Sequence, residues 1–412
     1  MPPLTVYLIL QAASSLFFSL IFTVNMIYQV TVVGLSPLQL VLVGTTLEAT
    51  AFLFEIPTGV LADVKSRRLS VIIGYVLMGV AFIVEGSLPY FGTVLLSQGL
   101  WGLGYTFTSG ATQAWMADEV GEARAGEAFV RGAQASWIGA LVAIPLSVAL
   151  GSVSVQLPIV TGGGLMIALA GFLALTMGEE DFQPTPPGER TTWGMMAKTV
   201  RDARGMVARQ PVLLALLAIG LFYGLYSEGV DRLWTPHLLE SFAPPFGGQV
   251  DPVVWLGGLR GALLLGGLAA SEVVRRRVET EQGRSLSRLL AANTTLIVAG
   301  LAVFGLARDL WLAMATFWLV GTLRRVAAPL HEAWYNRRID DAQVRATLFS
   351  VTSQADALGQ IAGGPAVGAV GNVSIRAALV CSALLLAPVV PLYRVARGRE
   401  EKWEKSTTIA EN

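Results

Sequence analysis

Long apolar runs separated by short polar breaks constrain the fold more than any other feature of this sequence. The runs fall near residues 5–33, 38–62, 69–89, 92–117, 127–150, 155–177, 211–239, 252–274, 286–307, 309–335, 346–371 and 374–395. About 20 apolar residues are enough for a helix to cross the hydrocarbon core of a bilayer. With 53% hydrophobic and 14% charged residues, the chain is too apolar for a soluble globule. We expect an all-α membrane protein with twelve transmembrane helices.

The distribution of Lys and Arg predicts the topology of these helices. Arg308 and Arg376 fall on one side, four arginines fall inside the runs, and all other Lys and Arg residues share the side of Arg67. Positive charge is retained on the cytoplasmic side during insertion. We therefore expect a multi-pass protein of the cell (inner) membrane with both termini in the cytoplasm.

A polar stretch near the middle of the chain divides the runs into two sets of six. Residues 179–210 contain acidic residues and a proline cluster, and the sequence predicts a surface helix at 193–209 with basic residues on one face. We expect an N-terminal six-helix bundle at 1–178, a cytoplasmic linker at 179–210, a C-terminal six-helix bundle at 211–396 and a cytoplasmic tail at 397–412.

The two sets of runs repeat weakly in sequence. Ala114-Trp115 matches Ala333-Trp334, and at nearly the same offset Phe129, Gln134 and Gly139 match Phe349, Gln354 and Gly359. This offset pairs the fourth and fifth runs with the tenth and eleventh. Repeats of this kind are typical of transporters built from two related bundles around a central cavity, so we expect the two bundles to be pseudo-symmetric.

The loop between the second and third runs has the sequence Gly-Val-Leu-Ala-Asp-Val-Lys-Ser-Arg-Arg at 59–68. It resembles the loop 2-3 signature of the major facilitator superfamily, Gly-x-Leu-Ala-Asp-Arg-x-Gly-Arg-Lys. Gly59, Leu61, Ala62, Asp63, Arg67 and Arg68 match the signature, whereas Val64 and Ser66 depart from it. The resemblance implies a cytoplasmic gate formed by Gly59, Asp63, Arg67 and Arg68, which we expect Asp118 to complete; a solvated surface acid is the alternative for Asp118.

Within this superfamily the chain looks most similar to twelve-span drug:proton exporters. The resemblance implies a proton-coupled secondary transporter that exports hydrophobic or amphipathic small molecules by alternating access. Gln98 stands where antiporters of the family commonly carry an arginine, four residues before Gly102-x-Gly104, so a proton relay in that helix is in doubt. A proton-coupled importer of a metabolite, or a lipid-handling member of the same fold, is the alternative.

Ionisable residues inside the apolar runs are the candidates for proton coupling, because a charge in the hydrocarbon region normally faces a cavity or a partner. Glu228, Asp231 and Arg232 lie within one helical turn of each other. A carboxylate that separates from an arginine during a conformational change can take up a proton. The candidates for proton coupling are Asp231, Glu228, Arg232, Arg260, Glu48 and Asp356; a purely structural ion-pair cluster is the alternative for the first three.

Polar residues in other runs are candidates for a substrate cavity. These are Glu48, Glu55, Asn25, Gln98, Arg324 and Arg325. Glu55 precedes Ile56-Pro57, so it can instead satisfy backbone groups freed by the proline. Adjacent helical residues point about 100° apart, so we expect one of the two arginines to face the cavity and the other to pair with Asp356 or with backbone.

Several classes of protein are excluded by the same sequence. Two His and one Cys supply neither a nucleophile set nor a metal set, so we expect no enzyme activity, no cofactor and no bound metal. A phosphate loop of the Gly-x-x-x-x-Gly-Lys-Ser/Thr type does not occur. The net charge is zero without a basic stripe, which gives no support for nucleic-acid binding. The expected partners are a small-molecule substrate, protons and the lipid bilayer, and we expect a monomer.

Overall fold

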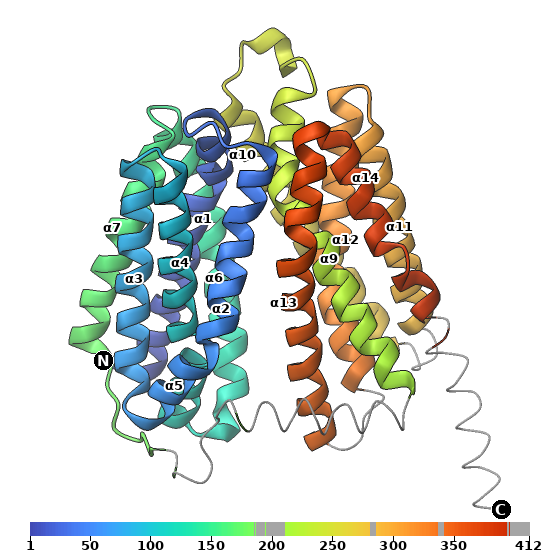
Figure 1. Cartoon of the computed structure of the whole chain (residues 1–412). Helices are drawn as coiled ribbons and strands as arrows, with labels where there is room; N and C mark the ends of the chain where they lie inside the picture. Colours follow the sequence, from blue (N-terminus) through green and yellow to red (C-terminus); the bar gives the residue numbers. More distant parts are fainter. Residues whose placement is uncertain are drawn as a thin grey trace, which may run out of the picture. The chain divides into compact units, whose positions relative to one another are not determined.

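The computed structural model describes residues 1–184, 186, 194, 211–280, 286–336, 342–393 and 395. Contacts between Cα atoms divide the chain into two compact units, Met1–Met196 with Gly248–Gly261 (unit 1) and Ala197–Gly247 with Ala262–Asn412 (unit 2). The described residues are all helix, turn or irregular structure, which agrees with the predicted all-α class (Figure 1). Apart from Gly194, the expected surface helix at 193–209 lies outside the described residues, as does the tail at 397–412.

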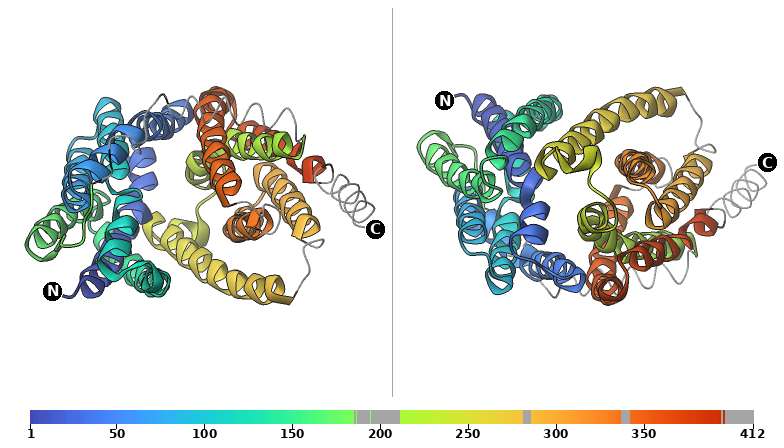
Figure 2. Two further views of the ribbon diagram at one scale, coloured as in Figure 1. Left: turned by 90° about the horizontal axis from the view of Figure 1, so that it is seen from below. Right: turned by 90° about the horizontal axis from the view of Figure 1, so that it is seen from above.

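Unit 1 is a helical bundle. Its helices are α1 (Pro3–Thr31), α2 (Pro37–Val64), α3 (Arg67–Ser87), α4 (Phe91–Thr108), α5 (Ala111–Val120), α6 (Glu122–Gly151) and α7 (Gln156–Thr176). α1 packs against α6 and α7, and α3 packs against α4 and α7 (Figure 2). The Ser36 side chain starts α2 through a capping box with Gln39, and the Ser66 hydroxyl accepts the backbone N–H of Leu69 at the start of α3.

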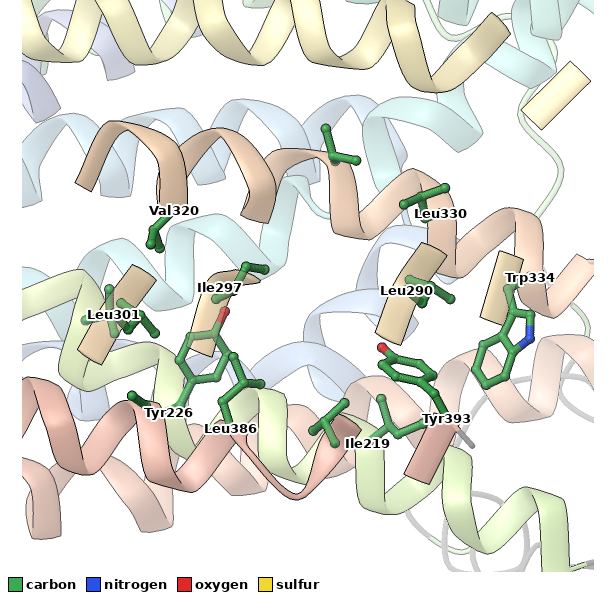
Figure 3. Close-up of a cluster of buried hydrophobic side chains, with 14 of the residues drawn as sticks. Ile219, Tyr226, Leu290, Ile297, Leu301, Val320, Leu330, Trp334, Leu386 and Tyr393 are labelled. Atoms are coloured by element: carbon green, nitrogen blue, oxygen red, sulfur yellow. The ribbon is translucent and has the colours of Figure 1, made fainter. Parts of the chain in front are cut away.

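Unit 2 contains α9 (Pro211–Glu240), a short 3-10 turn η1 (Pro245–Gly248), the later part of α10 (Pro252–Thr280), α11 (Leu286–Leu306), α12 (Leu310–Asn336), α13 (Ala342–Val373) and α14 (Ile375–Leu386). α9 packs against α13 and α14, and α11 packs against α12 and α14. Figure 3 shows the core that joins these helices, in which Tyr226, Trp334 and Tyr393 lie among buried aliphatic side chains. This core fixes the helices that carry the site described below.

The helix boundaries correct one prediction from the sequence. The run at 92–117 is not a single helix, because α4 ends at Thr108 and α5 begins at Ala111. Gly110 between them has φ of 73°, a conformation that glycine adopts without steric cost. Among the described residues, nine helices are long and apolar enough to cross a membrane. The helices α4, α12 and α13 are not among these nine, and α12 carries Arg324 and Arg325.

The two units repeat the same helix packing in the same register. Gly139 of α6 leaves no room for a Cβ against the carbonyl of Ala12 in α1, and Gly359 of α13 leaves none against the carbonyl of Leu221 in α9. About two turns further along, the Ser147 hydroxyl of α6 donates to the Leu20 carbonyl in α1 (2.6 Å). At the same place in unit 2, Gly229 of α9 lies against Val367 of α13. α1 and α6 therefore correspond to α9 and α13, as the sequence repeat predicts.

Candidate functional site

A cavity of about 490 Å³ lies inside unit 2. Four aromatic rings, from Tyr223, Tyr226, His331 and Phe349, form part of its wall. Ile219, Gly220, Ala327 and Ala328 extend the apolar part of the wall, and hydroxyl, amide and charged groups come from Ser227, Asp231, Arg324, Glu332, Thr352, Ser353, Asp356 and Gln360. An apolar wall with a few polar groups is typical of a small-molecule site, and here the polar groups come from three helices, α9, α12 and α13.

Asp231 of α9 and Arg324 of α12 form a bidentate ion pair on the wall of this cavity. The Arg324 Nη1 and Nη2 atoms donate to Oδ1 and Oδ2 of Asp231 at 2.5 and 2.8 Å. The Asp231 side chain is 48% exposed and that of Arg324 is 25% exposed. The Arg324 guanidinium also lies over the Tyr226 ring, 5.4 Å from its centroid. The pair is thus reachable from the cavity, and Arg324 has a second favourable contact besides Asp231.

The neighbouring pair on α9 is buried. The Arg232 Nε atom lies 3.4 Å from Oε2 of Glu228, with side-chain exposures of 12% and 6%. Arg232 lies one position from Asp231, but Asp231 pairs with Arg324 on another helix. The sequence predicted one local cluster of Asp231, Glu228 and Arg232. In the structure Glu228 and Arg232 form a buried pair, whereas Asp231 faces the cavity and pairs with Arg324.

Asp356 lies on the same cavity wall without Arg324 as its partner. Its Oδ2 atom accepts a hydrogen bond from Nε2 of Gln360, one turn further along α13 (2.7 Å). The backbone of Asp356 lies against Gly224 of α9, which has no space for a Cβ. Arg324, the arginine of α12 that lines the cavity, has Asp231 as its carboxylate partner and not Asp356.

The other candidates on α12 are placed differently. The side chain of Arg325 lies against Gly267 of α10 and does not line the cavity, so only Arg324 of the two arginines does. His331 lines the cavity, meets the Tyr223 ring edge to face at 5.2 Å and is hydrogen-bonded to the Tyr393 hydroxyl. As expected from adjacent positions on a helix, the two arginines point in different directions.

Unit 1 contains a polar network that sequence reasoning missed. The Glu85 side chain of α3 is fully buried, and its carboxylate accepts hydrogen bonds from Asn25 (2.8 Å), Gln29 (2.7 Å), Ser97 (3.1 Å) and Gln98 (3.2 Å). The candidates Asn25 and Gln98 are thus partners of Glu85, and both are buried. The sequence feature that could have predicted this network is a glutamate inside one apolar run together with amide side chains in two other runs.

The position of Glu85 corresponds to an aromatic position in unit 2. Tyr28 of α1 donates to the Glu85 carbonyl (2.6 Å), and His237 of α9 is hydrogen-bonded to the Phe304 carbonyl of α11 (3.0 Å). Phe304 packs on Phe317 with ring centroids 5.5 Å apart. Unit 2 therefore has the Phe304 ring at the position where unit 1 has the Glu85 carboxylate.

At the position of Asp231 the difference is reversed: unit 2 has a charged residue where unit 1 has an aromatic one. Asp231 precedes His237 by as many residues as Phe22 precedes Tyr28, so Phe22 is its equivalent in unit 1. Phe22 belongs to a cluster with Phe18, Phe82 and Trp101, and its ring centroid lies 4.9 Å from that of Trp101. Ionic groups at this position are thus not required for packing of the repeat, which favours a functional role for Asp231.

Three further candidates lie in unit 1. Glu48 on α2 is partly buried and Glu55 on the same helix is exposed. Arg260, in the part of α10 that belongs to unit 1, donates to the Phe22 carbonyl of α1. None of the three lines the 490 Å³ cavity.

The loop after α2 is held by an ion pair. Arg67 at the start of α3 pairs with Asp118 of α5, and its Nε atom lies 3.9 Å from Asp63. Arg68 instead donates to the Ala174 carbonyl (2.5 Å), and its backbone N–H donates to Glu179 (3.0 Å). Gly59 has open space around its Cβ direction. The structure thus brings Asp63, Arg67 and Asp118 together and directs Arg68 elsewhere.

Among the described residues, no group of three or more His, Cys, Asp or Glu side chains could hold a metal ion. The carboxyl groups that line the cavity are those of Asp231, Glu332 and Asp356.

Comparisons with known proteins agree with this architecture. The model of the family described as "Major Facilitator Superfamily" matches residues 7–280. An "Uncharacterized MFS-type transporter YxaM" of Bacillus subtilis (strain 168) is 22% identical over 366 residues, which are 87% of each chain.

Solved structures of transporters share the fold. The nucleoside transporter NupG superposes with a TM-score of 0.75 at 12% identity, covering 96% of this chain and 99% of NupG. A bacterial homologue of the human lysosomal transporter Spinster, in an inward-facing and unoccupied conformation, gives 0.69 at 15% identity, covering 96% and 98%. A POT family transporter in complex with 5-aminolevulinic acid gives 0.69 at 13% identity, covering 95% and 94%. These similarities confirm the predicted fold class.

Proposed function

The chain belongs to the major facilitator superfamily and is a secondary transporter rather than an enzyme, and from this premise we propose that it exchanges protons for an amphipathic organic cation. The Asp231–Arg324 pair carries this proposal, because it is an ion pair inside a membrane-spanning bundle that a cavity exposes on one side. The buried Glu228–Arg232 pair we assign to structure.

Asp231 is the proposed proton carrier. When Asp231 is ionised, Arg324 neutralises it through two hydrogen bonds. When Asp231 takes up a proton, Arg324 keeps its contact with the Tyr226 ring, so breaking the ion pair does not leave the guanidinium without an interaction. A pair that can exist in both states is what proton coupling requires.

Asp356 is the proposed substrate contact. Because Arg324 already pairs with Asp231, we assign the contact with the cation to Asp356, whose carboxyl group lines the cavity and accepts a hydrogen bond from Gln360. The rings of Tyr223, Tyr226 and Phe349 on the same wall suit the apolar or aromatic part of a cation. A lipophilic cation combines both requirements, and export is the direction we propose from the resemblance to drug:proton exporters.

Transport in proteoliposomes tests this function. Addition of a lipophilic cation such as tetraphenylphosphonium outside the vesicles should draw protons out of the lumen and raise the pH that an enclosed dye reports, and an acidic lumen should drive accumulation of the cation. Failure of any lipophilic cation to move protons, while a proton gradient drives uptake of a neutral metabolite, would contradict the proposal.

Import of a polar metabolite is the second candidate. Hydroxyl and amide groups of Ser227, Thr352, Ser353 and Gln360 line the cavity and could bind such a solute. The nucleoside transporter and the complex with 5-aminolevulinic acid are relatives in fold with polar solutes. Uptake assays with both solute classes, under inward and outward gradients, separate the two candidates.

A further inference from the structure

A second pocket in unit 2 lies away from the cavity that holds Asp231. Its volume is about 250 Å³, roughly eight times the ~30 Å³ that one water molecule occupies in the liquid. It is lined by Ser287, Arg288, Ala291, Ala292 and Thr295 of α11, together with Val390 and Tyr393. It shares none of these residues with the proposed transport site.

Ser287 and Arg288 form the polar end of this pocket. Ser287 is only 2% exposed, and its hydroxyl has no hydrogen-bond partner among the described residues. A buried hydroxyl without a partner is unfavourable unless a ligand or water satisfies it. Arg288 beside it is exposed and forms no ion pair with another described residue. Both residues lie in the first turn of α11, where the helix dipole adds further positive potential.

The remaining lining continues along the helix into an apolar groove. Ala291 and Thr295 follow Ser287 at successive turns of α11, and Ala292 follows Arg288. The Thr295 hydroxyl is satisfied by the Ala291 carbonyl (2.7 Å), so it offers the groove mainly its methyl group. Small side chains on this face leave room for a hydrocarbon chain beside Val390.

Tyr393 closes the pocket and is held firmly. Its ring packs edge to face on Trp334 at 5.5 Å, and its hydroxyl is hydrogen-bonded to His331. Figure 3 shows Tyr393 among the buried side chains of the unit 2 core. The wall of the pocket at Tyr393 therefore belongs to the packed core of unit 2.

We propose that this pocket binds an anionic phospholipid, with its phosphate at Ser287 and Arg288 and the start of one acyl chain along Ala291 and Thr295. The Lys and Arg distribution predicts that this end of α11 faces the cytoplasm, so the lipid belongs to the inner leaflet. A free phosphate would bind only at the polar end of the pocket, and a diacylglycerol would bind only along the apolar groove.

Thermal unfolding of the full chain in detergent tests the site. Dioleoylphosphatidylglycerol should raise the midpoint of unfolding, because a ligand that binds the folded state stabilises it by mass action. Inorganic phosphate and dioleoylglycerol, each at the same concentration, should give no comparable rise. A rise with phosphate alone would overturn the lipid assignment in favour of a soluble anion.

Variants make the test specific to these residues. Arg288→Gln should weaken the apparent affinity for the lipid by about tenfold or more, whereas Arg276→Gln, an exposed arginine of α10, should leave it unchanged. Ser287→Ala should raise the midpoint without lipid, since it removes a buried hydroxyl without a partner, and yet reduce the rise that the lipid causes. Equal loss in Arg276→Gln, or an unchanged lipid effect in Arg288→Gln, would overturn the proposal.

Discussion

Asp231 and Arg324, which lie on different helices of unit 2, meet through two parallel hydrogen bonds on the wall of a cavity. In unit 1 the position equivalent to Asp231 is Phe22, which packs in an aromatic cluster. The repeat therefore folds with or without the carboxylate at this place. A partly exposed ion pair in a membrane bundle is costly, and its presence in one unit only supports a role in transport.

Asp231→Asn should abolish transport driven by a proton gradient while preserving substrate binding and substrate exchange. The amide can keep a hydrogen bond to Arg324 but cannot carry a proton. Counterflow and gradient-driven uptake in proteoliposomes measure the two activities. Glu127→Gln, which breaks an exposed pair with Arg131, is the matched control and should behave like the unmodified chain. Full gradient-driven activity in Asp231→Asn would exclude this residue as the proton carrier.

Asp356→Asn should weaken the binding of a lipophilic cation by about tenfold or more, since a charge-assisted contact is lost. The affinity for an uncharged analogue of the same shape should change little. Tryptophan fluorescence titration or a thermal shift with both ligands provides the comparison. If both ligands lost affinity equally, Asp356 would act on the shape of the cavity and not on charge recognition.

Asp118→Asn and Arg67→Gln should each cripple transport, because Arg67 pairs with Asp118 and approaches Asp63 within 3.9 Å. Asp63→Asn should have the same effect while ligand binding stays largely intact. Lys65→Gln removes a charge of the same loop that forms no ion pair with another described residue, and it serves as the control. Normal transport in Asp118→Asn would show that the pair is dispensable for gating.

Glu85→Leu should lower the free energy of unfolding by about 2–4 kcal/mol, because the donors of Asn25, Gln29 and Gln98 lose a buried acceptor. Glu85→Gln keeps an acceptor oxygen of similar shape, so its loss should be smaller. Thermal or denaturant unfolding in detergent measures both. A Glu85→Leu chain as stable as the unmodified one would mean that the network adds nothing to stability.

Gly359→Ala should lower stability by about 1–3 kcal/mol, because an added Cβ would meet the Leu221 carbonyl and the α9 backbone. Gly164→Ala on α7 is the control, since an added Cβ there meets nothing within 4 Å. It should be neutral or slightly stabilising, as Ala favours a helix over Gly. Similar destabilisation of both variants would argue against close packing of α9 and α13.

The sequence predicted most of the fold because the amino-acid composition of a short stretch is enough to indicate a membrane helix. Long apolar runs, the positions of Lys and Arg, and matched glycines such as Gly139 and Gly359 are read directly along the chain. The sequence also identified the ionisable residues inside the runs as candidates, because burying a charge in a membrane costs free energy at any position. The break at Gly110 escaped it, since one residue with positive φ leaves no trace in an apolar pattern.

The sequence by itself determined that this chain is a membrane-spanning helical repeat with charged groups in its spans, because hydrophobicity and charge act at each residue. Which groups meet was decided only by the tertiary structure. Arg232 is the sequence neighbour of Asp231, yet Arg324 is its partner, because helix rotation and the packing of α9 against α12 and α13 set which faces converge. For the same reason Glu85 became the centre of a buried network with residues from two other helices.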